Sequence, residues 1–196
     1  MEKMRCGWAG SDPLYVMYHD TEWGMPLFDD KKLFEFLVLE TFQAGLSWIT
    51  VLRKRENFRN AFDGFDFMKI AFYDDPKEAE LLNDAGIIRN RLKIKAAINN
   101  ARAYIEIRKE LGSFSNYIWG FTEGKSINNS FRSLSDLPAK TDLSDRISND
   151  LKKRRFKFVG STVVYAHMQA SGMVNDHLTS CFRYAELKKL GSKQES

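Results

Sequence analysis

Glu40 closes a strongly apolar segment and is followed by a glycine and a tryptophan. Residues 33–39 are mostly hydrophobic, which predicts a buried helix, and Glu40 lies one turn after Phe36 on the same face. A carboxylate there needs a protein, water or ligand partner, because an isolated buried charge is very costly. Gly45 breaks the helix and Trp48 opens the next one, so this segment predicts a pocket for a flat polar ligand. The alternative is a glutamate satisfied by backbone groups beside an ordinary core tryptophan.

The two cysteines and two of the three histidines form a second candidate site. His177 and Cys181 are four residues apart and share a helical face, while Cys6 and His19 lie near the other end of the chain. Two thiolates and two imidazoles are a complete tetrahedral set for zinc, which would fasten both ends together. Spacing alone favours the alternative, in which these residues are unrelated. The third histidine, His167, has no companion and is interpreted as structural.

Residues 81–95 predict a helix, a tight turn and a second helix. Gly86 permits the left-handed conformation that we expect in such a turn. Backbone amides in the turn and at the next helix N-terminus would bind a phosphate without reading bases. Cations follow directly in the sequence, at Arg89, Arg91, Lys93 and Lys95. An ordinary αα-hairpin with a glycine has the same pattern, so both interpretations stay open.

Helices would position all of these groups. Apolar periodicity predicts them near residues 33–43, 47–62, 76–85, 90–111, 113–121, 143–155 and 161–170. Asp75 is expected to cap the helix that Pro76 opens. The polar segment 124–141 is expected to be a mobile loop. Without strand alternation or repeats, the sequence predicts an all-α fold, with one domain of two helical lobes over 1–185 and a solvated tail over 186–196.

Composition limits the classes of protein. A hydrophobic content of 43% over 196 residues supports a folded globule, and a net charge of +4 is weak evidence for a polyanionic partner.

No apolar run is long enough to span a membrane, and the N-terminus leads into no signal-type apolar segment. We therefore expect a cytoplasmic protein without a disulfide. It is also expected to be a monomer and to be associated with the nucleoid. The basic runs 53–55 and 152–155 are interpreted as solvated faces. The aromatic-rich segment 4–26 either packs a small lobe or stacks on bases.

Several stretches together resemble the bacterial 3-methyladenine DNA glycosylase I family. They are Arg5–Trp8, Asp12–Tyr15, Tyr18–Asp20, Glu22–Gly24, Gln43–Leu52, Asp84–Arg89, Phe156–Gly160 and Val174–His177. They extend from Arg5 to about Cys181, nearly the whole chain. The resemblance implies the helix-hairpin-helix glycosylase fold. It also implies a structural zinc that joins the two ends of the chain, held by Cys6, His19, His177 and Cys181.

The resemblance also implies roles for individual residues. In this family a damaged adenine lies in an aromatic pocket beside a glutamate, here Glu40, which holds the base edge and is a candidate helper of the attacking water. The matching aromatic positions are Trp8, Tyr15, Tyr18, Trp23 and Trp48. Residues that would contact DNA are Gln43, Gly45 and Leu46, facing the gap in the duplex, and Gly86, Arg89 and Lys93. At 40–43 the chain reads Glu-Thr-Phe-Gln, where Glu-Gly-x-Gln is often expected.

The expected activity is monofunctional hydrolysis of the N-glycosidic bond in alkylated double-stranded DNA, releasing free 3-methyladenine. No aspartate occurs between Gly86 and Asp136, where many relatives of the wider fold carry a catalytic one. This absence fits a cationic base that is already a good leaving group. One alternative is a non-catalytic binder of damaged or abasic DNA. A zinc deaminase is disfavoured, because four protein ligands leave no open position for water. Lysines beside the hairpin fit phosphate contacts better than a lyase.

Overall fold

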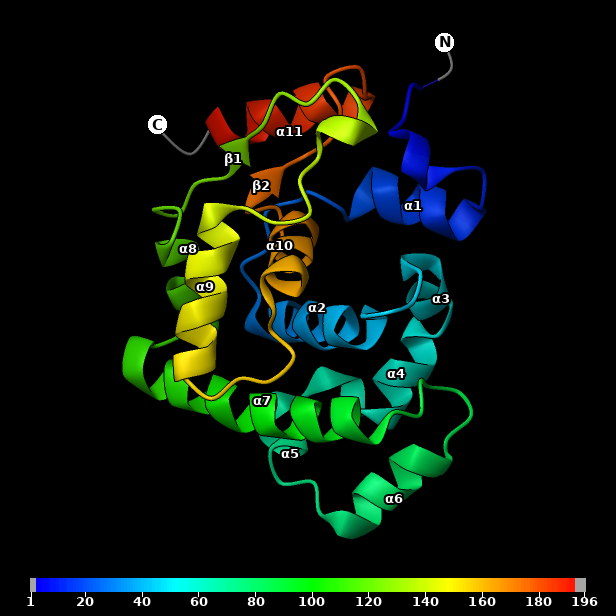
Figure 1. Ribbon diagram of the computed structural model, residues 1–196, viewed down its shortest axis with the longest axis vertical. Helices are drawn as coiled ribbons and strands as arrows, with labels where there is room; N and C mark the ends of the chain where they lie inside the picture. Colours follow the sequence, from blue (N-terminus) through cyan, green and yellow to red (C-terminus); the bar gives the residue numbers. More distant parts are fainter. Residues whose placement is uncertain (1–2, 193–196) are drawn as a thin grey trace.

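Helices make up most of the structure, a computed structural model that describes residues 3–192 (Figure 1). The elements are η1 (Gly7–Ala9), α1 (Pro13–Thr21), α2 (Asp30–Gln43), α3 (Trp48–Arg53), α4 (Arg55–Ala61), η2 (Asp63–Phe65), α5 (Phe67–Ile70), α6 (Asp75–Asn83), α7 (Arg91–Leu111), α8 (Phe114–Gly120), β1 (Ile127–Asn128), η3 (Leu134–Asp136), α9 (Asp142–Lys153), α10 (Ser161–Ala170), β2 (Val174–Asn175) and α11 (Phe182–Ser192). No helix among the described residues is long and apolar enough to cross a membrane.

Helix α2 is the centre of the molecule. It contacts α3, α7, α8 and α10, and every residue from 33 to 42 is buried. Its two ends are held by different kinds of contact. At the start, the Tyr104 hydroxyl of α7 donates to the Asp30 carbonyl at 2.6 Å. Near the end, the Phe42 ring packs edge-on against Phe58 of α4, with 4.8 Å between centroids. Packing on all faces fixes the last turn of α2, which carries Glu40.

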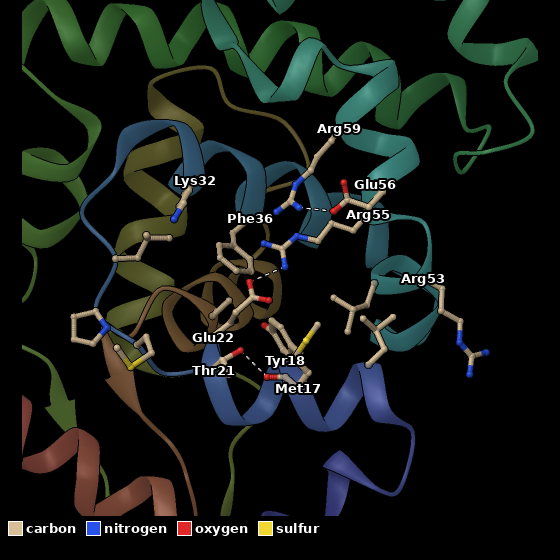
Figure 2. A pocket seen from close by; sticks show the side chains of 16 residues that line it. Met17, Tyr18, Thr21, Glu22, Lys32, Phe36, Arg53, Arg55, Glu56 and Arg59 are labelled. Atoms are coloured by element: carbon tan, nitrogen blue, oxygen red, sulfur yellow. Dashed lines mark hydrogen bonds and ion pairs between the residues drawn. The ribbon is translucent and has the colours of Figure 1, made fainter.

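A buried ion network joins α2 to its neighbours. Arg55 of α4 donates to Glu35 of α2 at 2.5 Å and to Glu22, just after α1, at 2.6 Å. Figure 2 shows the Arg55 side chain reaching Glu22 across the floor of a cavity. The adjacent Arg53 pairs with Asp12 at 2.6 Å. The expectation that the basic run 53–55 is a solvated face holds for the exposed Arg53 but was wrong for Arg55, which is buried and joins α2 to the segment after α1.

Apart from shifts of a few residues at helix ends, two predicted helices differ from the structure. The helix expected over 47–62 is divided into α3 and α4, which meet at Lys54. Helix α6 is capped by Asp74, whose carboxylate accepts from the Lys77 amide at 3.0 Å, and not by Asp75. The sequence Asp74-Asp75-Pro76 offers two acidic caps, and the extended backbone of Asp74 decides between them.

Segment 124–141, expected to be a mobile loop, is anchored to the C-terminal part of the chain. Its strand β1 pairs in parallel with β2, with Ile127 opposite Val174. Beside this pair, the Asn129 amide donates to the Asp176 carboxylate at 2.6 Å. The all-α expectation therefore needs a correction, since two-residue strands are too short to leave an alternating pattern.

The expected tail over 186–196 is helical as far as it is described. Helix α11 continues to Ser192, and Leu187 is buried. A Cβ built on Gly24 would lie 3.0 Å from the Leu187 side chain, so α11 covers the segment after α1. Residues 193–196 lie outside the described residues. The two helices nearest the chain ends, α1 and α11, lie at the same end of the molecule (Figure 1).

Candidate functional site

A cavity of about 200 Å³ lies at the end of α2, where α1, α3 and α10 meet. It is lined by Trp8, Tyr15, Tyr18, Trp23, Glu40, Gln43, Trp48, Leu137, Ala166 and Gln169. The structure thus brings the predicted glutamate and all five predicted aromatic residues around one space. Pockets for drug-sized ligands usually measure about 300–1,000 Å³, so this cavity suits a single small ring system.

The aromatic side chains form most of the cavity wall. Trp8 contacts Tyr15 and Trp23, with ring centroids 5.0 and 4.9 Å apart, and Tyr18 lies 5.4 Å from Trp48. These pairs are tilted or edge-on, so the rings do not stack flat against one another. The Trp48 indole nitrogen is buried and has no hydrogen-bond partner among the described residues. An electron-rich wall of this kind favours a flat and positively charged guest.

Glu40 is 4% exposed and forms no hydrogen bond or ion pair with any residue that the structure describes. Burial raises the pKa of its carboxyl to about 8. Burial, followed by the negative charge of Glu40, also raises the pKa of Tyr15. The alternative of a glutamate satisfied by backbone groups therefore fails. A carboxyl held without a partner at the edge of an aromatic cavity can accept hydrogen bonds from a ligand, and a cationic ligand would favour its ionised form.

A second cavity of about 450 Å³ adjoins the first and shares Gln43, Ala166 and Gln169 with it. It is also lined by Gly45 and Leu46, which belong to the α2–α3 loop (residues 44–47). Gly45 has a φ of +84°, a conformation that favours glycine, and Leu46 is 42% exposed. This loop therefore projects an apolar side chain beside the approach to Glu40.

Three cavity residues, Leu137, Ala166 and Gln169, were not predicted from the sequence. Leu137 follows η3 in the segment expected to be a loop, and the other two come from α10. Gln169 is held in place because its amide donates to the buried Asp176 carboxylate at 2.8 Å. These residues lie more than 90 positions from Glu40 in the sequence. The matching stretches Phe156–Gly160 and Val174–His177 lie on either side of Ala166 and Gln169 and were the nearby signals.

The cavity in Figure 2, of about 500 Å³, lies on the other side of Tyr18. Tyr18 lines both spaces, so its ring separates them. Arg55 and Glu22 neutralise each other on its floor, and Arg59 pairs with Glu56 beside them. The charges of these four side chains are therefore compensated within the protein.

The α6–α7 turn (residues 84–90) is supported from α4. Lys54 donates to the carbonyls of Ala85 and Gly86 at 3.0 and 3.1 Å, and the Gly86 amide donates to the Asp84 carboxylate at 2.7 Å. Gly86 is not left-handed, so that expectation was wrong. A Cβ at this position would lie 2.9 Å from the Asp84 carboxylate, so the close approach explains the glycine.

The two predicted cations near this turn have different environments. Arg89 is exposed and pairs with no described residue. Lys93 is 7% exposed, and its ammonium donates to the Phe42 and Ala44 carbonyls at 2.9 and 2.6 Å. Burial lowers the pKa of Lys93. Arg89 is therefore available to an outside anion, while Lys93 is committed to the end of α2.

Cys6, His19, His177 and Cys181 are all buried, and their ligand atoms lie within 4.8 Å of one another. Each thiol sulfur lies near a histidine nitrogen. The distances are 3.6 Å from Cys6 to His177, 3.5 Å from Cys181 to His19 and 3.5 Å from Cys181 to His177. Tetrahedral zinc, with bonds of about 2.3 Å to sulfur and about 2.0–2.1 Å to nitrogen, separates sulfur and nitrogen ligands by about 3.5–3.6 Å.

The second nitrogen of each imidazole has its own partner. His19 Nδ1 lies 2.7 Å from the Asp20 carboxylate, and His177 Nε2 lies 3.0 Å from the Trp23 carbonyl. These contacts place the ring protons away from the cluster and leave a lone pair facing it on each histidine. The donors therefore fit a metal ion with four protein ligands. Trp23 also lines the aromatic cavity at the end of α2, so the cluster supports one wall of that cavity.

Fold and sites together define a helical protein with a small aromatic cavity beside a buried cluster of four potential metal ligands. Residues 8–184 match the family model described as Methyladenine glycosylase, so the chain belongs to the methyladenine glycosylase family. It is 51% identical to the DNA-3-methyladenine glycosylase 1 of Escherichia coli (strain K12), over 92% of this chain and 96% of that protein.

Two solved structures are similar throughout. A crystal structure of 3-methyladenine DNA glycosylase I matches with a TM-score of 0.89 and 50% identity, over 91% of this chain and 98% of that one. The Staphylococcus aureus enzyme, solved to explain 3-methyladenine recognition, matches with a TM-score of 0.88 and 36% identity, over 91% and 95% of the two chains. The family resemblance seen in the sequence is thereby confirmed.

Proposed function

We propose that this protein is a DNA glycosylase that removes 3-methyladenine from alkylated DNA. The observation that carries the proposal is Glu40, a buried carboxyl at the edge of an aromatic cavity that has no partner within residues 3–192. Similarity along most of the chain to enzymes that act on this base supports the same activity. The protein is a hydrolase of N-glycosyl bonds.

The residues of the cavity fit the chemistry of this substrate. Methylation at N3 gives the adenine a positive charge, which weakens the glycosidic bond before the enzyme acts. We propose that the nucleotide is flipped from the duplex, and that the base stacks against Trp48 and the tyrosines while Glu40 accepts hydrogen bonds from its edge. A water then forms the new bond to the sugar carbon, and the base leaves with the electron pair of the broken bond. Glu40 is placed to hold the base, and is a candidate acceptor for the water's proton.

DNA contact is proposed for two surfaces. Amides of the α6–α7 turn and the exposed Arg89 suit a phosphate, as in a helix-hairpin-helix motif. The α2–α3 loop, with Gln43 before it, suits the gap left by the flipped nucleotide, and the exposed Leu46 would fill part of it. We further propose one glycosylase domain that acts as a monomer.

We propose zinc as the metal held by the four-residue cluster, because two thiolates and two neutral imidazoles are its preferred donors. Bound there, the ion would supply structural cross-linking between the two ends of the chain. Four protein ligands leave no position for a reacting water.

The test combines base release with base binding. Wild-type protein should release 3-methyladenine from alkylated duplex DNA, in an assay that resolves it from 7-methylguanine. Glu40→Gln should fold normally but bind free 3-methyladenine at least about tenfold more weakly, because one charge-assisted hydrogen bond contributes about 1.5–3 kcal/mol. Glu56→Gln, on the exposed face of α4, is the matched control and should bind as wild type does.

The outcomes separate the candidate functions. Binding of alkylated DNA without any base release would support the non-catalytic alternative and reject the enzyme. Equal base affinity in a folded Glu40→Gln protein would reject Glu40 as the recognition residue.

A further inference from the structure

Lys93 makes a contact that its position in a basic segment does not predict. It lies in the first turn of α7, yet its ammonium donates to the carbonyls of Phe42 at 2.9 Å and Ala44 at 2.6 Å. These carbonyls belong to the C-terminal end of α2, about 50 positions earlier in the chain. The contact therefore joins two of the elements to which we assign DNA contact.

The end of α2 needs such a contact. The last carbonyls of a helix lack partners within it and carry the negative end of the helix dipole, so a buried cation stabilises them. Just beyond, Gly45 adopts a φ of +84° and the Leu46 amide donates to the Gln43 carbonyl at 2.6 Å, which makes a tight turn. Lys93 thus holds both the last helical turn and the loop that begins there.

The same lysine is anchored to the α6–α7 turn. The Asn90 side chain, at the end of that turn, accepts from the Lys93 backbone amide at 3.1 Å. Lys54 also supports the turn, through the Ala85 and Gly86 carbonyls. If the α6–α7 turn moves, Lys93 should therefore move with it and shift the α2–α3 loop.

A phosphate contact by Lys93 does not fit this environment. The side chain is 7% exposed, and two of its three N–H donors are already used. Arg89, four residues earlier, is exposed and pairs with no described residue. The two cations therefore have different roles. Arg89 is free to contact DNA, whereas the Lys93 ammonium contacts only carbonyls of the protein.

We propose that Lys93 is a positioning residue that fixes the α2–α3 loop relative to the α6–α7 turn. When the turn binds a DNA phosphate, the fixed loop then places Leu46 at the duplex gap. This inference rests on the proposed glycosylase function. It assigns Lys93 to the opening of the duplex, and not to DNA affinity or to binding of the free base.

The experiment compares Lys93→Met, which keeps the length of the side chain, with Arg89→Ala. Three quantities are measured for each variant and for wild type: single-turnover release of 3-methyladenine from duplex DNA, affinity for undamaged duplex over a range of salt concentrations, and affinity for free 3-methyladenine. Fluorescence of 2-aminopurine placed next to the lesion reports unstacking of the duplex directly.

Lys93→Met should slow base release about ten- to a hundredfold, because a loop displaced by about 1 Å costs as much. It should also reduce the 2-aminopurine signal. Affinity for the free base, and the salt dependence of binding to undamaged DNA, should match wild type. Arg89→Ala should instead reduce the slope of log K against log salt by about 0.9, as expected for one lost phosphate contact. Lys93→Arg, which retains donors for both carbonyls, should restore a large part of the release rate.

Several results would overturn the proposal. A salt slope reduced by Lys93→Met would make Lys93 a phosphate contact, and an unchanged release rate would remove any positioning role. Equal loss of free-base affinity and of release would mean that Lys93 only supports the fold. If Lys93→Met does not fold, Lys93→Gln, which removes the charge but keeps a donor, is measured in the same way and judged by the same outcomes. Failure of wild type to release the base would reject the proposed function itself, a result that no Lys93 variant can produce.

Discussion

The two glutamates of α2 show how environment assigns different tasks to one residue type. Glu35 is buried and accepts from Arg55 and Arg59, at 2.5 and 2.7 Å. Glu40, five positions later, is equally buried and has no partner among the described residues. A paired buried carboxylate joins helices, whereas an unpaired one is costly to the folded state unless a ligand satisfies it. An unpaired buried carboxylate at Glu40 lowers the stability of the free protein, as we expect of a residue that recognises a ligand.

This cost gives a prediction about pH. The Glu40 carboxyl has a pKa of about 8 in the folded state against an ordinary 4.5, so between these values the folded state retains a proton that the unfolded state releases. Wild-type stability therefore falls as pH rises through this window, by about 1 kcal/mol per pH unit. Glu40→Gln lacks this loss, and its melting temperature relative to wild type should increase steadily from pH 5.5 to pH 8.

Melting curves of wild type, Glu40→Gln and the surface control Glu56→Gln across this range check the prediction. Differences from wild type also cancel the pH response of the cysteines and histidines, which all three proteins share. Parallel curves for wild type and Glu40→Gln would mean that the Glu40 carboxyl is already stabilised in the free protein.

At the scale of elements, short turns with close backbone contacts place the site residues. The turn between α10 and β2 has Gly172 at a φ of +71°, and a Cβ there would lie 2.3 Å from the Met25 carbonyl carbon. This approach brings β2, and the His177 that follows it, against the segment after α1. His177 then contacts the Trp23 carbonyl, so one turn positions both the Cys and His cluster and a cavity wall.

Gly172→Ala should therefore be strongly destabilising. Backbone atoms cannot move aside as a flexible side chain can, and the left-handed conformation adds strain, so we expect a loss of at least about 2 kcal/mol. For a chain of this size that lowers the melting temperature by about 4–8 °C. Gly120→Ala, at the end of α8, is the control, because a Cβ there meets nothing within 4 Å and φ is not positive. A control variant that melts as early as Gly172→Ala would show that the backbone contact is not the cause.

At the scale of the whole molecule, the Cys and His cluster connects the beginning and the end of the chain. Cys6 lies just before η1, and Cys181 lies just before α11. A metal ion bound by all four residues would stabilise the folded chain, because these ligands come together only on folding. The cluster should therefore control global stability, and should act on the aromatic cavity through the ring contacts of His19 with Trp8 and of His177 with Trp23.

Removal of the metal tests this role. Chelation of purified protein, or Cys181→Ser, should remove several kcal/mol of stability and lower the melting temperature by about 10 °C or more. Below the melting transition, affinity for free 3-methyladenine should be largely retained. The chelator should have no further effect on Cys181→Ser. Metal analysis that finds no zinc, together with freely reactive Cys6 and Cys181, would reject the assignment.

Local patterns in the sequence were sufficient for much of this molecule. Helical periodicity predicted most helices, and an acid at the end of an apolar helix marked Glu40 as a residue that needs a partner. The family resemblance is confirmed, and the ring pocket and the zinc ligands implied by it stay predictions, although their residues lie together in the structure. These features depend on residue type and on spacing within a few turns, which the sequence states directly.

Only the tertiary structure decided which partner each side chain has. The sequence placed Lys93 among cations, but the structure commits it to the carbonyls at the end of α2. Segment 124–141 looked like a free loop, yet it pairs with β2 and supplies Leu137 to the cavity. Gly86 proved necessary for close approach and not for a left-handed turn. Each of these outcomes depends on groups that are distant in sequence or on the exact path of the backbone, and neither leaves a periodic signal in the chain.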